Sequence, residues 1–270
     1  MAEKWKDNTK KWQQASEKWK NPLQKMKDKL DSGKSAIVKP TEAKILASAF
    51  NRVDSDNETF YRAGSDYKAE YEAKGIVTRI VQVYNGRDIV EEINNLSNDG
   101  KLKRLDLLGH ASSQGLFFKE DINLGLDIRK VNLYSNKQVI QDVETAENLK
   151  ISSPDAAVLS DINFAKFDYA CRIEIHGCAA AGDVFGDGLD LFVKEFSILL
   201  FNAGKSAGVV IVHIGACKDI SQYGYRHGTR VAYNNGKILS INGQYIYEEK
   251  GDIPDIVIKT ALKQKYNIQE

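Results

Sequence analysis

The sequence predicts an α/β protein in which a mostly parallel sheet of about six strands lies between two layers of helices. From residue 75 onward, segments typical of strands alternate with segments typical of helices, and consecutive parallel strands need such crossover connections. The run "GVVIVHIGA" (208–216) is apolar almost throughout, as expected of a strand that helices cover on both faces. These patterns together predict a three-layer sandwich.

The first half of the chain contributes two of the predicted strands. Residues 41–75, including "TEAKILASAFNRV", have a helical and polar pattern. Residues 75–84 ("GIVTRIVQVY") are predicted to form a strand and residues 86–96 ("GRDIVEEINNL") a helix. The next strand is expected at 102–110 ("LKRLDLLGH"), followed by the hairpin-like "QGLFF". Residues 119–153 are irregular and polar, which indicates an insertion.

The second half completes the predicted sheet. After the turn-like "SDINFAKF", a third strand is expected at "CRIEIH" (171–176), then an apolar helix at 188–204 that stops at Gly204, and then the strand at 208–216. Residues 229–249 predict two antiparallel strands around Asn235-Gly236, a dipeptide that favours tight hairpin turns. A last helix is expected at about 255–266.

The N-terminal region differs from the rest in charge and pattern. The first 40 residues hold eleven lysines against five acids, whereas the whole chain has a net charge of only +1. Trp5, Trp12, Trp19 and Met26 recur every seven residues and form a narrow apolar stripe on a helix that Pro22 interrupts. The stripe can be covered by the protein's own domain, by a partner protein such as a chaperone or secretion machinery, or by a membrane surface.

These differences predict two parts. Residues 1–36 are expected to be a basic helical appendage with its linker, and residues 37–270 one α/β domain. The balanced charge of the whole chain gives no reason to expect nucleic acid as a partner, and no apolar run is long enough for stable membrane insertion. The N-terminus lacks the apolar core of a signal peptide. We therefore expect a cytoplasmic protein, or one exported without a conventional signal peptide.

Candidate catalytic side chains follow the ends of consecutive predicted strands. In an open parallel sheet, working residues gather beyond the carboxyl ends of the strands. His110 follows "LDLLG", Cys178 follows "IEIHG", and Cys217 follows "VHIGA". A thiol held as thiolate by a neighbouring imidazolium can attack a carbonyl carbon, so Cys178 and His110 are candidates for a nucleophile and its general acid/base.

The two motifs "LLGHASSQG" and "IEIHGCAAAG" resemble those of the caspase-like cysteine peptidases, a group that includes caspases, legumain, clostripain and gingipain. The likeness covers roughly residues 75–220 and is nearest to bacterial caspase-like domains. It implies the caspase-like three-layer fold and a thiol protease that hydrolyses peptide bonds through a thioester. It also implies that the backbone amides of Cys178 and Ala111 form the oxyanion hole. Most of the family has glycine where this sequence has Ala111.

Other interpretations of these residues stay open. Cys178 can be a buried free thiol, because cysteine often packs as a small apolar residue. Cys217 is a second candidate nucleophile, since "IGACKD" also ends a strand. His176 can pair with the thiol of Cys178 or be structural. His176, Cys178, His213 and Cys217 are possible zinc ligands, but their spacing is not typical of zinc sites, so no metal and no organic cofactor are expected.

A substrate pocket is expected around the same edge of the sheet. Its candidate residues are Gly177, which leaves room for a substrate backbone, together with Asp183, Cys217 and His227. Carboxylates in "GDVFGDGLD" can hold a basic side chain or calcium, although capping of the next helix is the simpler role for Asp187. The "NAGKSAG" segment (202–208) lacks one glycine of a phosphate-binding loop and ends a helix, so no nucleotide site is predicted.

The sequence thus supports a cysteine endopeptidase acting on a protein or peptide substrate. The alternative is a non-catalytic interaction module of the same fold, which the alanine at position 111 favours. Either of these can be an exported bacterial effector, with the tryptophan-bearing helix as its loading signal.

Overall fold

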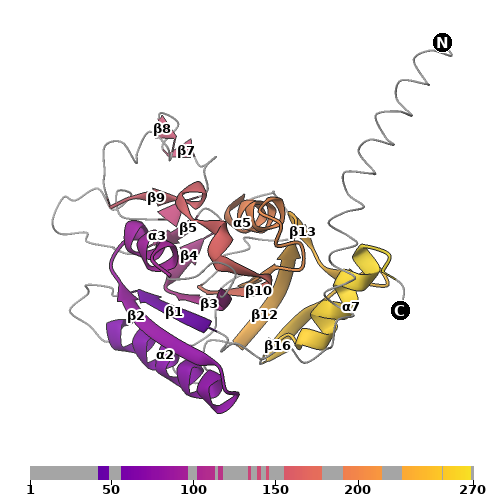
Figure 1. The fold of residues 1–270 in the computed structure, drawn as a ribbon, viewed down its shortest axis with the longest axis horizontal. Helices are drawn as coiled ribbons and strands as arrows, with labels where there is room; N and C mark the ends of the chain where they lie inside the picture. The colour runs from indigo at the N-terminus through magenta and orange to yellow at the C-terminus, as the bar shows by residue number, and fades with distance from the viewer. Residues whose placement is uncertain are drawn as a thin grey trace, which may run out of the picture.

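The structure is a computed structural model. It describes residues 42–48, 56–96, 102–112, 115–117, 133–134, 139–140, 144–145, 155–177, 191–214, 227–250 and 252–268. Within these residues an eight-stranded sheet forms the centre of the protein, in the order β13-β12-β11-β10-β3-β1-β2, with β16 also pairing with β12 (Figure 1). The α/β class and the mostly parallel sheet are confirmed.

The central strands are parallel and most of their residues are buried. They are β1 (Glu42–Ser48), β2 (Val77–Val83), β3 (Leu102–Leu108), β10 (Phe167–His176) and β11 (Val209–His213). β12 (His227–Asn234) runs antiparallel to β11, and β13 (Lys237–Ile238) and β16 (Tyr247–Lys250) both pair antiparallel with β12. The sheet therefore has more strands than the expected six.

One of the additional strands corrects the sequence prediction. The segment "EAKILAS" was expected to be helical, but it forms β1, which lies between β2 and β3 in the sheet. Its alternation of side chains explains the difference: Ala43, Ile45 and Ala47 belong to the cluster that packs against one helix, and Leu46 belongs to the core on the opposite face. A strand covered on both faces can contain alanine and leucine, which are also good helix formers.

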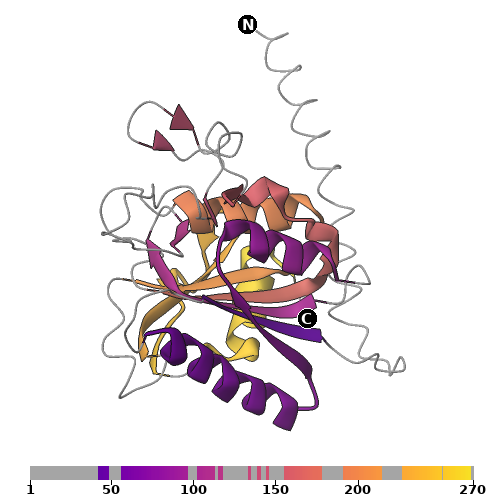
Figure 2. The ribbon, with the colours of Figure 1, turned by 90° about the vertical axis from the view of Figure 1, so that its left-hand side faces the viewer.

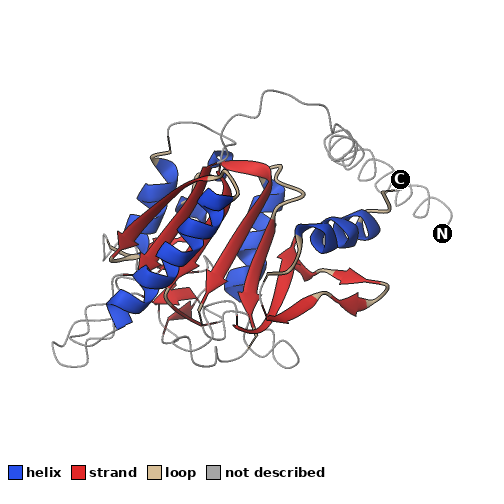
Figure 3. Cartoon of the chain, turned by 90° about the horizontal axis from the view of Figure 1, so that it is seen from below, coloured by secondary structure: helices blue, strands red, loops and turns tan. Residues whose placement is uncertain are grey.

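Helices cover the sheet on both faces, which gives three layers (Figure 2). On one face, α2 (Asp56–Ala73) packs on β1 and β2, and α7 (Asp255–Lys265) packs on the apolar side chains of β11 and β12 (Figure 3). On the other face, α3 (Gly86–Asn94) and α5 (Leu191–Asn202) enclose the largest apolar core. Gly204, in a left-handed conformation with φ 81°, follows α5 and confirms the predicted stop.

The C-terminal hairpin region is more divided than the sequence predicted. Asn235 and Gly236 have φ of 48° and 70°, which confirms the tight turn between β12 and β13. A second turn at Asn242-Gly243 joins β14 (Ser240–Ile241) and β15 (Gln244–Tyr245), after which β16 returns to β12. This second turn adds the last strand of the sheet.

A smaller sheet lies beside the central one. It consists of β4 (His110–Ser112), β5 (Gly115–Phe117), β6 (Leu133–Tyr134) and β9 (Ala157–Val158). The pairing of β4 with β5 confirms the hairpin-like segment. β7 (Val139–Ile140) and β8 (Glu144–Thr145) form a separate pair in the predicted insertion. The predicted appendage at 1–36 lies outside the described residues.

Candidate active site

The backbone at the carboxyl ends of β3 and β10 brings the two candidate catalytic segments together. Gly109, which follows β3, donates its N–H to the carbonyl oxygen of His176 at 3.4 Å. The next residue on each segment is His110 on one side and Gly177 on the other. His110 is exposed, and its ring lies edge-on to Phe60 at 5.4 Å between centroids. The exposed imidazole of His110 therefore lies at the same edge of the sheet as Gly177, the residue that precedes Cys178 in the sequence.

Gly177 is packed against the His110 segment so tightly that no side chain fits there. A Cβ placed on Gly177 would lie 2.4 Å from the Cβ of Ala111 and 2.7 Å from the carbonyl oxygen of Gly109. Real Cβ atoms do not approach a neighbour below about 3.0 Å. The glycine before Cys178 thus allows the two chain segments to touch, which is a structural role beyond leaving room for a substrate.

The structure describes only some of the residues that were predicted to form the site. Gly177, His110 and Ala111 are described, and His227 begins β12, where its backbone pairs with Lys250. Cys178, Asp183 and Cys217 lie outside the described residues. The geometry of the candidate dyad and of the oxyanion amide at Cys178 therefore stays a prediction.

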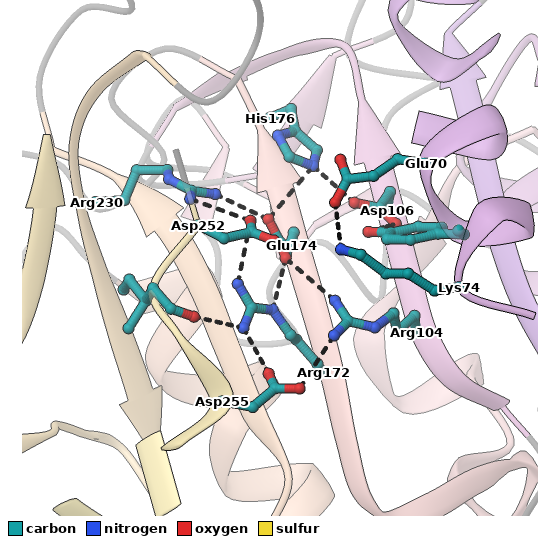
Figure 4. A network of polar contacts seen from close by, with 12 residues as sticks. Glu70, Lys74, Arg104, Asp106, Arg172, Glu174, His176, Arg230, Asp252 and Asp255 are labelled. Atoms are coloured by element: carbon teal, nitrogen blue, oxygen red, sulfur yellow. Dashed lines mark hydrogen bonds and ion pairs between the residues drawn. The ribbon is translucent and has the colours of Figure 1, made fainter. Parts of the chain in front are cut away.

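Beneath this edge, β3 and β10 carry charged side chains on the face that α2 and α7 share (Figure 4). Asp106 and Glu174 are paired in register, and both are almost fully buried. Asp106 contacts His176, with 2.8 Å between Oδ1 and Nε2, and it accepts a hydrogen bond from the Tyr71 hydroxyl at 2.9 Å. His176 reaches back along the strand toward Asp106, so its Nε2 is engaged away from the edge.

Glu174 is held by two arginines. The Nε atom of Arg172 donates to one carboxylate oxygen at 2.6 Å, and Arg230 from β12 donates to the other at 2.8 Å. Arg172 also donates to Asp255 at 2.9 Å. Burial lowers the pKa of the Arg172 guanidinium, but the neighbouring carboxylates, Glu174 first, outweigh this effect and hold the pKa above its usual value. We call this cluster of Asp106, Arg172, Glu174, His176 and Arg230 the buried ion network.

The buried ion network also contains the donor set that comes nearest to a metal site among the described residues. Ligand atoms of Asp106, Glu174 and His176 lie within 4.8 Å of one another. However, both oxygens of Glu174 already accept from guanidinium groups, and both oxygens of Asp106 are engaged by His176 and Tyr71. Two adjacent cations would also repel a metal ion. The arrangement is therefore that of an ion-pair network.

Cys171, the cysteine that the structure describes, is buried in the core beneath α5. Burial raises the pKa of its thiol, and the nearby Asp168 raises it further. A neutral buried thiol is a poor nucleophile. Cys171 is therefore a core residue.

Sequence reasoning considered only His176 among the members of the buried ion network and missed the network. The signal was present in two strands: "LKRLDLL" and "CRIEIH" alternate charged with apolar side chains, although both strands are buried. Charges that recur every second residue of a buried strand share one face and need partners there.

No protein-family model matches the chain, and no curated protein is significantly similar to it in sequence. Among the residues that the structure describes, no helix is both long and apolar enough to span a membrane.

Proposed function

We propose that this protein is a cysteine endopeptidase of the caspase-like type, with Cys178 as nucleophile and His110 as general acid/base. The observation that carries the proposal is the contact of Gly177 with Gly109 and Ala111 at the carboxyl ends of two neighbouring parallel strands. This contact brings Gly177, which precedes Cys178, next to the residues on either side of His110. Adjacent strand ends of this kind are where open α/β sheets hold their functional groups.

In this proposal the chemistry has two stages. The imidazole of His110 takes the thiol proton of Cys178, and the thiolate sulfur attacks the carbonyl carbon of the scissile peptide. The oxyanion that forms accepts hydrogen bonds from the backbone amides of Cys178 and Ala111. When the C–N bond breaks, His110 gives the proton to the leaving amine. Water, deprotonated by His110, then attacks the thioester, and the carbon–sulfur bond breaks to release the acid.

At the predicted oxyanion hole this chain has Ala111 where most caspase-like peptidases have glycine, and the methyl group of Ala111 lies next to Gly177. A Cβ at position 177 would clash with this methyl group, so the glycine at position 177 leaves the space that the methyl group occupies. The methyl group and Gly177 are therefore complementary, which supports an oxyanion hole that retains alanine in place of glycine.

Cysteine reactivity tests the proposal. The full chain is treated with iodoacetamide near pH 7 for short times, and labelled peptides are quantified. An activated Cys178 reacts faster than Cys217 and far faster than the buried Cys171. The substitution His110→Ala, which removes the base, lowers the rate at Cys178 to that of Cys217 and leaves Cys217 unchanged. Equal rates at Cys178 and Cys217 in the unmodified protein contradict the assignment.

A peptide-cleavage assay distinguishes a peptidase from a non-catalytic interaction module. A mixture of peptides that together present every residue before the scissile bond is incubated with the protein and with the variants Cys178→Ser and Cys217→Ser. A peptidase cleaves at least one peptide, and cleavage is lost in Cys178→Ser but kept in Cys217→Ser. Fast labelling of Cys178 without any cleavage supports an interaction module instead.

A further inference from the structure

A cavity of about 370 Å³ lies at the end of the sheet opposite the candidate active site. It is lined by the starts of β3, β10 and β11, by the turn after α2, and by α7. Arg172 of β10 lines the cavity, and Gly177 lies five residues further along the chain, just beyond the end of β10 and about 16 Å away at the usual rise of a strand. The cavity is therefore separate from the proposed peptidase site.

The charges of the cavity lining are mostly positive. Among the described residues, the lining includes four basic side chains, Lys103, Arg104, Arg172 and Lys259, and a single carboxylate, that of Asp255. That carboxylate contacts both arginines, Arg104 at 3.2 Å and Arg172 at 2.9 Å, but 71% of its side chain is exposed. An exposed carboxylate is strongly solvated and compensates Arg104 only in part, whereas Arg172 is also paired with the buried Glu174.

Nη1 of Arg104 and Nη2 of Arg172 are buried and make no hydrogen bond in the described structure. The nearest carboxylate oxygen of Glu174 is 4.0 Å from Nη1 of Arg104, and Asp252 is 3.3 Å from Nη2 of Arg172. The nearest acceptors for these two nitrogens are protein carboxylates, so the preference for an anionic ligand rests on the excess of basic side chains in the lining.

The rest of the lining is apolar. The other described residues of the lining have side chains without polar groups, and they are Ile76, Ala170, Ala207, Val209, Ile258 and Leu262. A site that combines cationic donors with an apolar wall suits a ligand with an anionic head and an apolar body. The volume fits a small organic molecule rather than a bare inorganic ion.

We propose that this cavity binds a small organic anion, a phosphate monoester or a carboxylic acid with an aryl or alkyl body. The head accepts from Arg104 and from the ammonium of Lys259, and the body packs on Ile258 and Leu262 of α7. This site does not depend on the proposed peptidase activity.

The test uses the full chain and three probes. Binding of 4-fluorophenyl phosphate is followed by fluorine NMR, and 4-fluorophenol and inorganic phosphate are compared with it to separate the contributions of head and body. The complete probe is expected to bind saturably, and each partial probe at least about tenfold more weakly. Lack of saturable binding of 4-fluorophenyl phosphate at millimolar concentration overturns the proposal.

Two substitutions locate the site. Lys259→Gln and Arg104→Gln are each expected to weaken binding of 4-fluorophenyl phosphate about tenfold, because each removes a charged donor. Lys263→Gln is the matched control: it makes the same change one turn further along α7, outside the cavity lining, and is expected to alter affinity less than twofold. If Arg104→Gln does not fold, Lys259→Gln decides. Unchanged affinity in Lys259→Gln, or equal weakening in Lys263→Gln, contradicts this location.

Discussion

Asp106 and His176 join two neighbouring strands through a contact of 2.8 Å between Oδ1 and Nε2, and only 1% of either side chain is exposed. Asp106 accepts a second hydrogen bond from Tyr71 on α2. The carboxylate therefore connects β3, β10 and the helix above them.

Replacing Asp106 tests how much these two hydrogen bonds contribute to the free energy of unfolding. Asp106→Ala leaves the Tyr71 hydroxyl and the His176 ring without their acceptor, so we expect the free energy of unfolding to fall by about 3 kcal/mol. Tyr71→Phe removes only one bond and should cost about 1 kcal/mol. Equilibrium unfolding in urea measures both. Asp66→Ala, at an exposed position of α2, is the control and should change stability by less than about 0.5 kcal/mol.

Gly177→Ala tests the contact between the two candidate catalytic segments. The new methyl group would lie 2.7 Å from the carbonyl oxygen of Gly109, a backbone atom that cannot rotate away. We expect a loss of at least about 2 kcal/mol in unfolding free energy together with slower labelling of Cys178.

Gly64→Ala provides the comparison for that substitution. Its methyl group would lie 2.5 Å from Cδ1 of Ile80, the mobile end of a side chain, and alanine favours the helix by about 1 kcal/mol. The net cost should therefore be below about 1 kcal/mol. A similar cost for both substitutions would show that the close contact at Gly177 is relieved by small shifts of the backbone.

The lowered pKa of Lys265 predicts how the free energy of unfolding depends on pH. Burial, and then repulsion from Lys237, lower the pKa of Lys265 from 10.5 to about 8. Between these two values the unfolded chain binds a proton that the folded protein does not, so stability rises as pH increases above about 8. Burial raises the pKa of Tyr266 and of Tyr169, and this lowers stability above pH ~10.

Stability should therefore increase by about 1 kcal/mol between pH 8 and 10, allowing for solvent screening of the partly exposed ammonium group. The substitution Lys265→Met removes this rise. Urea unfolding at pH 7.5, 8.5 and 9.5 measures it, with Lys263→Met on the same helix as the control that keeps the rise. A flat profile for the unmodified protein would show that the hydrogen bonds from Lys265 to Asn234 hold the ammonium in its charged form.

The tryptophan stripe at 1–36 predicts the behaviour of a truncated chain. If the segment is an appendage, the fragment 37–270 should fold and melt within a few degrees of the full chain. Thermal unfolding followed by circular dichroism compares the two. An insoluble fragment, or one that melts at a much lower temperature, would mean that Trp5, Trp12 and Trp19 complete the apolar core of the domain.

The sequence predicted those elements whose pattern has a single physical interpretation. The turn at Asn235-Gly236 needs positive φ at two residues, and that dipeptide adopts it readily. The stop at Gly204 follows from the same conformational freedom. β11 was recognised because its sequence is apolar and rich in β-branched residues, and the second half of β10 because its side chains alternate as in a strand.

β1 and the buried ion network were missed for a different reason. "EAKILAS" has a composition that suits helix and strand equally, and its place between β2 and β3 decides the outcome. The hydrogen-bond partners of Glu174 come from β10 itself and from β12, and the pairing with β12 depends on the sheet order. Local patterns do not contain that order.

The sheet order also has a consequence for how fast the chain folds. Ile45 pairs with Ile80 and Asp106 pairs with Glu174, so each parallel pairing requires a long loop to close before any contact offsets its entropy. By contrast, Asn234 pairs with Lys237 across a two-residue turn. We therefore expect the β12–β13 hairpin to acquire protected amides within the first milliseconds of refolding, and the centre of the sheet to follow orders of magnitude later. Pulse-labelled hydrogen exchange resolves the two stages, and simultaneous protection of β3, β10 and the hairpin would argue for a single concerted barrier.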